Sequence, residues 1–163
     1  MWEKPVYERR LSTVELLAYR TAVLEPDDLP FIESLLRQSE TWALVDHLAE
    51  AVAGDIVRRN PEAVEVLDRW AGDPDFWIRR SALLALLGPI RKGNGDLDRF
   101  SRYADGMLDE REFFIRKAIG WVLREIGKQN PDWVATWLDE RQGRVAPLAV
   151  REAVKYLPAP RRS

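Results

Sequence analysis

The sequence predicts an all-α protein, and more specifically an α-solenoid in which helices follow one another in pairs. Leu, Ala, Glu and Arg are frequent, and apolar residues recur at intervals of three and four, as on one face of a helix. The apolar–polar alternation typical of strands does not occur. Helix-breaking pairs recur every 35 residues, at Glu25-Pro26, Asn60-Pro61, Gly95-Asp96 and Asn130-Pro131. A regular period of this length is typical of solenoids built from helix pairs.

Each helix-breaking pair marks the start of the second helix of a repeating unit. Proline is favoured in the first turn of a helix, and Asn or Asp just before that turn accepts hydrogen bonds from its free N–H groups. The expected helices are 6–23, 27–38, 41–59, 61–71, 75–90, 96–108, 111–128, 131–141 and 147–157. We expect residues 1–157 to form a single domain and the tail 158–163 to be disordered, since no linker divides the chain.

The first helix of most units opens on basic residues. The sequences that do so are Arg9-Arg10, Ile78-Arg79-Arg80, Ile115-Arg116-Lys117 and Val150-Arg151, spaced by one or two multiples of roughly 35 residues. The unit that departs from this pattern carries Trp42 and Asp46 instead. Because these two residues are four apart, they share one helix face about one turn apart.

The helix of Trp42 and Asp46 also shows a separate apolar stripe. The stripe consists of Val45, Leu48, Val52 and Ile56. The face that remains carries Trp42, Asp46, Ala49 and Ala53, which is one large ring, one carboxylate and then small side chains. We expect this face to leave room for a bulky ligand beside the carboxylate.

The composition excludes several classes of chemistry. The chain has 163 residues and no cysteine, which removes disulfides, thiolate catalysis, zinc–thiolate sites and cysteine-ligated clusters. The only histidine is His47, so a histidine-rich metal site is impossible. We expect a surface or inter-helix position for His47 in preference to a catalytic one. No glycine-rich phosphate loop, metal-spaced cluster or nucleophile elbow is found, and we expect no metal and no cofactor.

Charge and hydropathy bear on location and on partners. The N-terminus lacks the apolar core of a signal peptide and no run reaches membrane-spanning length, so we expect a cytoplasmic protein without membrane contact. The formal net charge is −2 and the pI is near 5.6. These values count against nonspecific coating of nucleic acid but leave room for a local basic face.

The helix expected over 111–128 carries such a basic face. Lys117, Trp121, Arg124 and Lys128 follow one another at steps of four, three and four. Basic residues with an aromatic ring between them suit a phosphate backbone together with a sugar or base. The alternative is that Trp121 packs against the neighbouring repeat while the cations are only solvated.

Three further residues extend this face by repeat register. Arg80 aligns with Lys117, and arginine suits bidentate phosphate contacts. Arg79 recurs as Arg116 and Arg151, so it is a candidate for bridging adjacent repeats as well as for binding. Tyr156 occupies the position of Trp121 in the last unit and adds a second aromatic ring.

Five segments, in order along nearly the whole chain, resemble the AlkD-like family of DNA alkylation-repair glycosylases. The segments are Asp28–Glu33, Trp42–Asp46, Phe76–Ala82, Glu112–Glu125 and Pro147–Ala153. The block around Trp121 is the most specific of them. The resemblance implies HEAT-like repeats and a superhelix whose concave face holds duplex DNA. It also implies hydrolysis of the N-glycosidic bond of N3- and N7-alkylated purines, without metal, cofactor or base flipping, in contrast to most glycosylases.

The resemblance also implies roles for individual residues. Asp46 matches the catalytic aspartate of the family, and Trp42 and Trp121 match two tryptophans that pack on the deoxyribose of the lesion. One residue of the Arg79-Arg80 pair matches an arginine near the phosphate, and its spacing to Trp121 favours Arg80. The remaining predicted DNA contacts are Arg79, Lys117, Arg124, Lys128 and Tyr156.

The chain departs from the family pattern at two points. Family members usually have further N-terminal helices, whereas this sequence begins inside what resembles an interior repeat, which indicates either a short form or a misplaced start. Ala43 also stands where an acidic residue is common in the family. We expect a monomeric glycosylase acting on duplex DNA that contains alkylated purines. The alternatives are a non-catalytic HEAT-like module that binds DNA or a protein, and a related fold acting on RNA or another glycoside.

Overall fold

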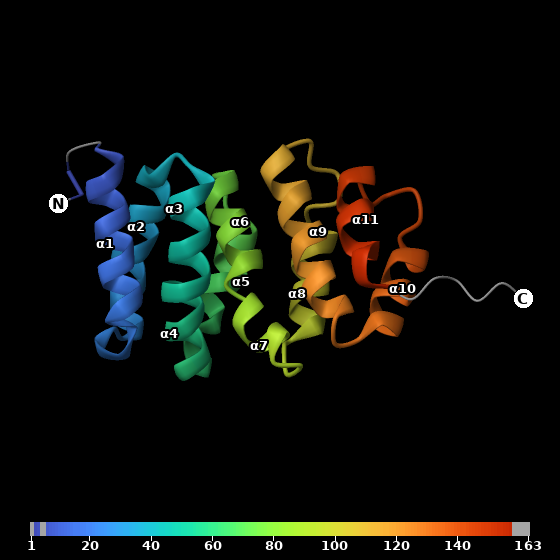
Figure 1. Ribbon diagram of the computed structural model, residues 1–163, viewed down its shortest axis with the longest axis horizontal. Helices are drawn as coiled ribbons and strands as arrows, with labels where there is room; N and C mark the ends of the chain where they lie inside the picture. The colour runs from blue at the N-terminus through green and yellow to red at the C-terminus, as the bar shows by residue number, and fades with distance from the viewer. Residues whose placement is uncertain (1, 4–5, 158–163) are drawn as a thin grey trace, which may run out of the picture. The chain divides into compact units, whose positions relative to one another are not determined.

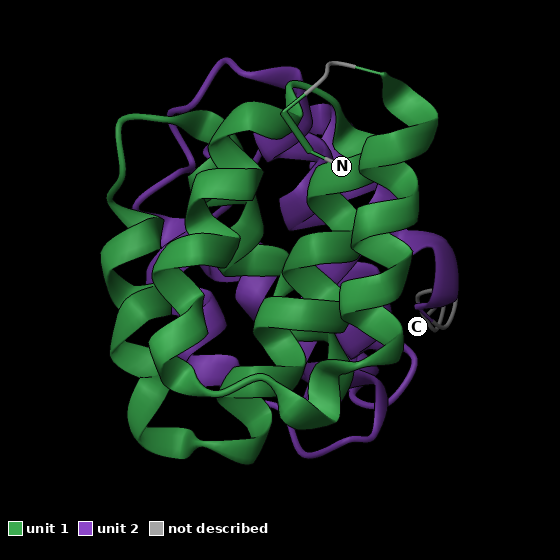
Figure 2. Cartoon of the chain, turned by 90° about the vertical axis from the view of Figure 1, so that its left-hand side faces the viewer, with its two compact units in different colours: residues 1–88 green, residues 89–163 purple. Residues whose placement is uncertain are grey.

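The protein is described by a computed structural model that covers residues 2–3 and 6–157. Throughout these residues the regular secondary structure is helical, which confirms the predicted all-α class (Figure 1). The chain forms two compact units, residues 1–88 and residues 89–163 (Figure 2). The single domain over 1–157 stays a prediction, and the tail 158–163 lies outside the described residues.

Unit 1, residues 1–88, contains the first six α-helices and several short helical segments. The α-helices are α1 (Tyr7–Tyr19), α2 (Leu29–Ser39), α3 (Trp42–His47), α4 (Gly54–Arg59), α5 (Glu65–Ala71) and α6 (Phe76–Leu84). Short 3₁₀ turns lie at Thr21–Val23, Pro26–Asp28 and Pro61–Val64, and a π-helical segment, Leu48–Ala53, joins α3 to α4. The predicted helix over 41–59 is therefore one helical stretch with a wider turn in its middle.

Unit 2, residues 89–163, contains the remaining helices. They are α7 (Leu87–Arg91), which begins just before the unit, α8 (Leu97–Asp105), α9 (Phe113–Gly127), α10 (Pro131–Glu140), α11 (Pro147–Ala153) and the 3₁₀ turn Val154–Tyr156. The expected helix over 75–90 is divided, because α6 ends at Leu84 and α7 begins at Leu87. The other expected helices of this unit are confirmed to within a few residues at each end.

Two of the four helix-breaking pairs cap the following helix as predicted. The Asp96 carboxylate accepts a hydrogen bond from the backbone N–H of Arg99 at 2.9 Å. The side-chain oxygen of Asn130 accepts one from the backbone N–H of Trp133 at 3.2 Å. Each bond satisfies an N–H group that has no partner inside the first turn.

The other two pairs start their helices differently. At the first, a capping box joins Glu25 and Asp28, in which the Glu25 backbone N–H donates to the Asp28 carboxylate at 2.9 Å. At the second, the predicted Asn60 cap is wrong. The Asn60 amide donates backwards to the Ile56 carbonyl at 2.9 Å and closes the end of α4. Pro61 starts the next turn without a side-chain cap.

Ion pairs between successive helices follow the repeat period. In unit 1, Arg37 bonds to Asp73, 36 residues later, at 2.6 Å. In unit 2, Arg141 bonds to Asp105, 36 residues earlier, at 2.6 Å. The sequence period of 35 residues is thus matched by side chains that link neighbouring helices within each unit.

The helix of Asp46 is fully packed on one side. The predicted stripe is buried throughout: Val45, Leu48, Val52 and Ile56. The prediction that Ala49 and Ala53 lie on an open face is wrong, because both are fully buried. Both residues lie in the π-helical segment Leu48–Ala53, whose turn is wider than an α turn.

Gly54, directly after the π segment, permits a close approach of two backbones. A Cβ atom at Gly54 would lie 2.6 Å from the carbonyl oxygen of Ala85, just after α6. Only glycine fits without moving one of these backbones. The contact brings the helix of Asp46 and the end of α6 together inside unit 1.

Candidate functional site

An ion pair between α3 and α6 is the central feature of unit 1. The Arg80 Nε donates to the Asp46 Oδ1 at 2.7 Å, and its Nη2 donates to Oδ2 at 2.8 Å. The two parallel bonds form a bidentate fork, the strongest geometry for a carboxylate and a guanidinium. Arg80 is only 2% exposed, so the pair is shielded from water on the arginine side.

Asp46 keeps access to solvent although it is paired. Its side chain is 14% exposed, and each carboxylate oxygen has a further lone pair beyond the one used by Arg80. Trp42, one turn earlier on α3, is 55% exposed. A large exposed indole therefore stands beside a carboxylate that is held in place from behind. Of the four predicted catalytic residues, Trp42, Asp46 and Arg80 lie in this unit, whereas Trp121 belongs to unit 2 and its place in the site stays a prediction.

Arg79, the neighbour of Arg80, has a structural role. Its Nη1 donates to the backbone carbonyls of Asp73 and Pro74 at 2.6 and 2.8 Å, in the loop before α6. The structure thus separates the two candidates: Arg79 holds the loop, and Arg80 reaches Asp46. The contact of Arg80 with a DNA phosphate stays a prediction, as does DNA binding by Arg79.

The same loop contact recurs in unit 2, as the repeat register predicts. Arg116 donates from Nε to the backbone carbonyl of Glu110 at 2.7 Å, six residues earlier, as Arg79 does toward Asp73. In both cases the arginine ties the preceding loop to its own helix, and a role in bridging adjacent repeats stays a prediction.

His47 lies next to Asp46 but faces another partner. Its Nδ1 lies 3.2 Å from the carboxylate of Glu15 on α1. Its side chain is one-third exposed. This is the inter-helix position that we expected for the only histidine.

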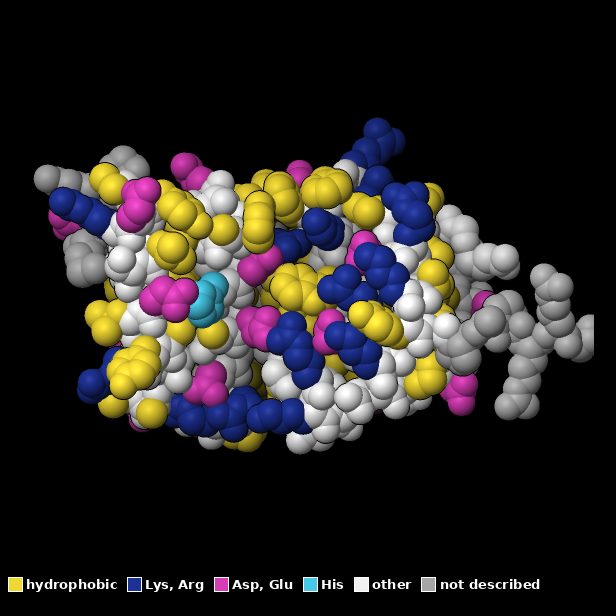
Figure 3. All heavy atoms as spheres, viewed as in Figure 1, with side chains coloured by type: hydrophobic (Ala, Val, Ile, Leu, Met, Phe, Trp, Pro, Cys, Tyr) yellow, Lys and Arg dark blue, Asp and Glu magenta, His cyan; other side chains and the backbone are white. Residues whose placement is uncertain are grey.

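Unit 2 presents a surface that we call the basic face. It consists of Arg91, Lys117, Trp121, Arg124, Lys128 and Tyr156. Figure 3 shows Lys and Arg side chains gathered around hydrophobic ones over α9. The Arg91 guanidinium lies 6.0 Å from the centre of the Trp121 ring, and the Lys128 ammonium lies 5.1 Å from that of Tyr156. Both distances allow cation–π attraction.

A buried carboxylate lies beneath these cations. Glu125 is 6% exposed, and its carboxylate accepts hydrogen bonds from Lys128 at 2.8 and 2.9 Å and from Arg91 at 3.3 Å. The Nε of Arg124 lies 3.7 Å away. Burial works to raise the pKa of Glu125, but the bonds and charges of Lys128 and Arg91 outweigh it, and the pKa lies below its ordinary value.

The remaining basic residues are tied to α11. Arg124 bonds to Glu152 at 2.8 Å, and Lys155 bonds to the same carboxylate at 2.8 Å. Lys117 is exposed and contributes, after Lys155 and Arg124, to the lowered pKa of Glu152. These contacts require α9 and α11 to lie close together, and a Cβ atom at Gly120 would lie 2.8 Å from the Cα of Ala149.

Sequence reasoning missed Arg91 and the burial of Glu125. A signal for this pair exists in the spacing. Arg91 and Glu125 are 34 residues apart, as are Asp46 and Arg80. A search for opposite charges separated by about one repeat length would have found both pairs.

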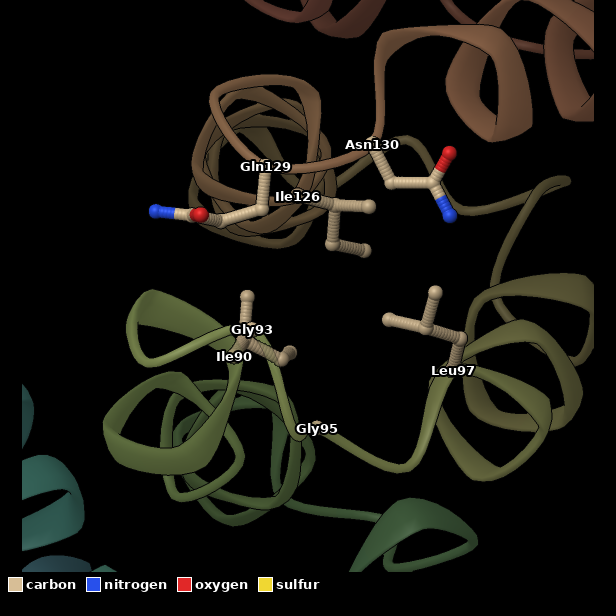
Figure 4. A pocket seen from close by; sticks show the side chains of 7 residues that line it. All are labelled: Ile90, Gly93, Gly95, Leu97, Ile126, Gln129 and Asn130. Carbon is tan, nitrogen blue, oxygen red and sulfur yellow. The ribbon is translucent and has the colours of Figure 1, made fainter.

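Unit 2 also holds a small cavity of about 220 Å³ between the residues around α7 and the end of α9 (Figure 4). Its lining consists of apolar, glycine and amide residues, and Figure 4 shows Leu97 and Ile126 extending toward its centre. The Gln129 amide donates to the Arg91 carbonyl at 3.3 Å and Asn130 caps α10. The two amide side chains that line the cavity are thus engaged in hydrogen bonds that stabilise the fold.

Within residues 2–3 and 6–157, no group of three or more histidine, cysteine or acidic residues could hold a metal ion. No helix among these residues has both the length and the apolar character needed to cross a membrane.

The helical fold is shared with solved bacterial structures. One is described as a predicted DNA alkylation repair enzyme from Enterococcus faecalis; it is 28% identical, with a TM-score of 0.87 over 96% of this chain and 71% of that chain. Another, AlkD2 from Streptococcus mutans, is 21% identical, with a TM-score of 0.74 over 97% of this chain and 78% of that chain. Among curated proteins, none matches the chain significantly.

The comparison with protein families gives the family directly. A family described as DNA alkylation repair enzyme matches residues 1–157. The chain therefore belongs to the DNA alkylation repair enzyme family, as the five segments of the sequence indicated.

Proposed function

We propose that the protein is a DNA glycosylase that hydrolyses the N-glycosidic bond of N3- and N7-alkylated purines in duplex DNA, without flipping the base. The observation that carries this proposal is the Asp46 carboxylate, held in a bidentate fork by buried Arg80 beside the exposed ring of Trp42. Membership of the repair family supports DNA as the partner.

The residue types suit the chemistry of a cationic lesion. An alkylated purine already carries positive charge, so its base leaves as a neutral molecule without a strong general acid and without a cofactor. As the C1′–N bond breaks, positive charge develops on the sugar. A carboxylate fixed near that charge stabilises the transition state more than the ground state. Asp46 is proposed for this role, and Trp42 for contact with the deoxyribose through its ring face.

The second half of the reaction needs an oriented water molecule. Water adds its oxygen to C1′ and releases a proton, so the products are an abasic sugar and the free base. The lone pairs of Asp46 beyond those used by Arg80 can accept a hydrogen bond from that water. Arg80 is proposed as the residue that fixes the direction of these lone pairs.

The basic face of unit 2 is proposed to bind the DNA backbone. Lys117, Arg124 and Lys128 supply positive charge in a protein whose net charge is −2, and charge of this kind provides most of the affinity for DNA. Trp121 and Tyr156 add ring surfaces for sugar or base.

A second candidate function has one observation in its favour. Both oxygens of Asp46 accept bonds from Arg80, which is also the arrangement of an ion pair whose only role is to join α3 to α6. In that case the protein is a non-catalytic module that binds DNA.

An excision assay separates the two candidates. Methylated duplex DNA is incubated with the native protein, with Asp46→Asn and with Glu40→Gln, a control that removes one exposed charge from the same unit. The glycosylase proposal expects native protein and control to release 7-methylguanine and 3-methyladenine, and Asp46→Asn to release about 10²-fold less. DNA binding without release by any of the three proteins contradicts it and favours the binding module.

A further inference from the structure

Glu125 has more cationic partners than a structural ion pair needs. Nitrogen atoms of Lys128, Arg91 and Arg124 lie 2.8, 3.3 and 3.7 Å from its carboxylate. Arg124 also bonds to Glu152 at 2.8 Å, so two carboxylates face these three positive charges. Since each of the three cations is at least one-quarter exposed, the remaining charge is displayed at the surface.

Three cations this close together repel one another unless an anion lies among them. Glu125 supplies that anion from below, because its own side chain is 7% exposed. Hydrogen bonds to this carboxylate thereby fix the directions of Lys128 and Arg91 before any ligand arrives, while Arg124, 3.7 Å away, is held by its bond to Glu152. The lowered pKa of Glu125, which Lys128 and Arg91 cause against the effect of burial, is consistent with this arrangement.

We infer that Glu125 is a positioning residue for DNA: it holds Arg91 and Lys128, next to Arg124, so that their outer N–H groups receive the phosphodiester backbone. Arg91 then becomes a DNA contact that the sequence pattern did not indicate. The inference rests on the proposed function only in taking duplex DNA as the ligand, and it is independent of glycosidic hydrolysis.

The neighbouring rings favour a phosphodiester of nucleic acid over an isolated phosphate ion. The Arg91 guanidinium lies against Trp121, and the Lys128 ammonium lies against Tyr156. Each cation is thus next to an aromatic surface, which suits a chain in which charged phosphates alternate with sugars and bases. A free phosphate ion has no sugar or base that could pack on these rings.

One substitution distinguishes an effect of net charge on DNA binding from an effect of Glu125 on the orientation of the cations. Glu125→Gln keeps the size of the side chain and removes one negative charge from the basic face. If only net charge mattered, this variant would bind DNA more tightly than the native protein. If Glu125 positions the cations, the variant binds more weakly, because the side chains of Arg91 and Lys128 lose the group that orients them.

The test measures binding of an unmodified duplex by the full chain over a range of salt concentrations. We expect Glu125→Gln to raise the Kd about tenfold and to lower the slope of log K against log salt by about 1, the loss of one phosphate contact. The matched control is Glu112→Gln, which removes a charge at the start of the same helix and is expected to bind at least as tightly as the native protein.

A thermal melt of each variant separates positioning from a purely structural role. A lower melting temperature with unchanged Kd and slope overturns the inference, as does equal or tighter binding by Glu125→Gln. If Glu125→Gln is unfolded at the assay temperature, the surface variants Arg91→Gln and Lys128→Gln take over the test. Each is expected to weaken binding several-fold and to lower the slope by about 1, and native-like binding by both overturns the inference.

The outcome is independent of the excision assay. Weaker binding by Glu125→Gln supports positioning even if no base is released, in which case only the glycosylase proposal fails. Base release by the native protein together with native-like binding by Glu125→Gln leaves the glycosylase proposal intact and overturns the role of Glu125. Absence of any salt-dependent DNA binding by the native protein overturns it as well.

Discussion

Replacing Arg80 by methionine removes the guanidinium of the Asp46–Arg80 pair while keeping an unbranched, apolar stem. Asp46 then loses two charge-assisted hydrogen bonds, of 2.7 and 2.8 Å, and stays largely enclosed. Breaking a buried pair from one side costs about 3–5 kcal/mol. Because the Asp46 side chain is 14% exposed and water can reach it, we expect the lower end, about 3 kcal/mol of the free energy of unfolding.

The assay is a double-mutant cycle measured by urea unfolding and circular dichroism. It compares the native protein with Arg80→Met, Asp46→Asn and the double variant. Once the carboxylate is neutral, loss of the guanidinium leaves no unpaired charge, so we expect a coupling energy of about 2 kcal/mol between the two sites. Additive effects, within about 0.5 kcal/mol, would refute the view that the fork couples α3 to α6.

Two further predictions concern acid stability and close packing. Hydrogen bonds from Arg69, and with smaller effect from Arg37, lower the pKa of Glu33 to about 2 against the effect of burial, so this carboxylate contributes stability above pH 4.5 that is lost as the pH falls toward 2. In urea unfolding at pH 7, Glu33→Gln should lower the free energy of unfolding by at most about 3 kcal/mol. The difference between the native protein and the variant should narrow below pH 4.5, and a difference that does not change with pH would contradict the lowered pKa of Glu33. Gly120→Ala should lower the free energy of unfolding by about 1–3 kcal/mol, because the new Cβ would lie 2.8 Å from the Ala149 Cα. An unchanged midpoint of urea unfolding would show that α11 can move without loss of stability.

The helices were predictable because their signals are local. Helix-breaking pairs and the three-to-four periodicity depend on residues close together in sequence. They predicted the order of the helices, and most helix ends to within a few residues. Asn60 shows the limit of such signals, because its amide closes α4 where a cap for the next turn was expected. The π turn after Asp46 was not predicted, and neither was the close contact of Gly54 with Ala85, because these two residues are distant from each other in sequence.

The residues of the candidate site could be chosen from the sequence by their types, whereas most of their contacts could not be predicted. Trp42 and Asp46 were selected because an aromatic and an acid replace the basic residues of other units. The partner of Asp46 was not foreseen: we placed Arg80 near a phosphate, because spacing along a helix does not show which buried group a long side chain reaches. Glu125 was hidden for the same reason, since burial of an acid beneath cations is a tertiary property.

Asp46 is proposed to act on the glycosidic bond. The most direct measurement is the single-turnover rate of base release from a duplex with one N7-methylguanine, with protein in excess over DNA so that binding is saturated. We expect the native protein to exceed the rate of spontaneous depurination, and Asp46→Asn to fall about 10²-fold toward that rate while still binding the duplex. A rate for Asp46→Asn equal to that of the native protein would contradict this role of Asp46.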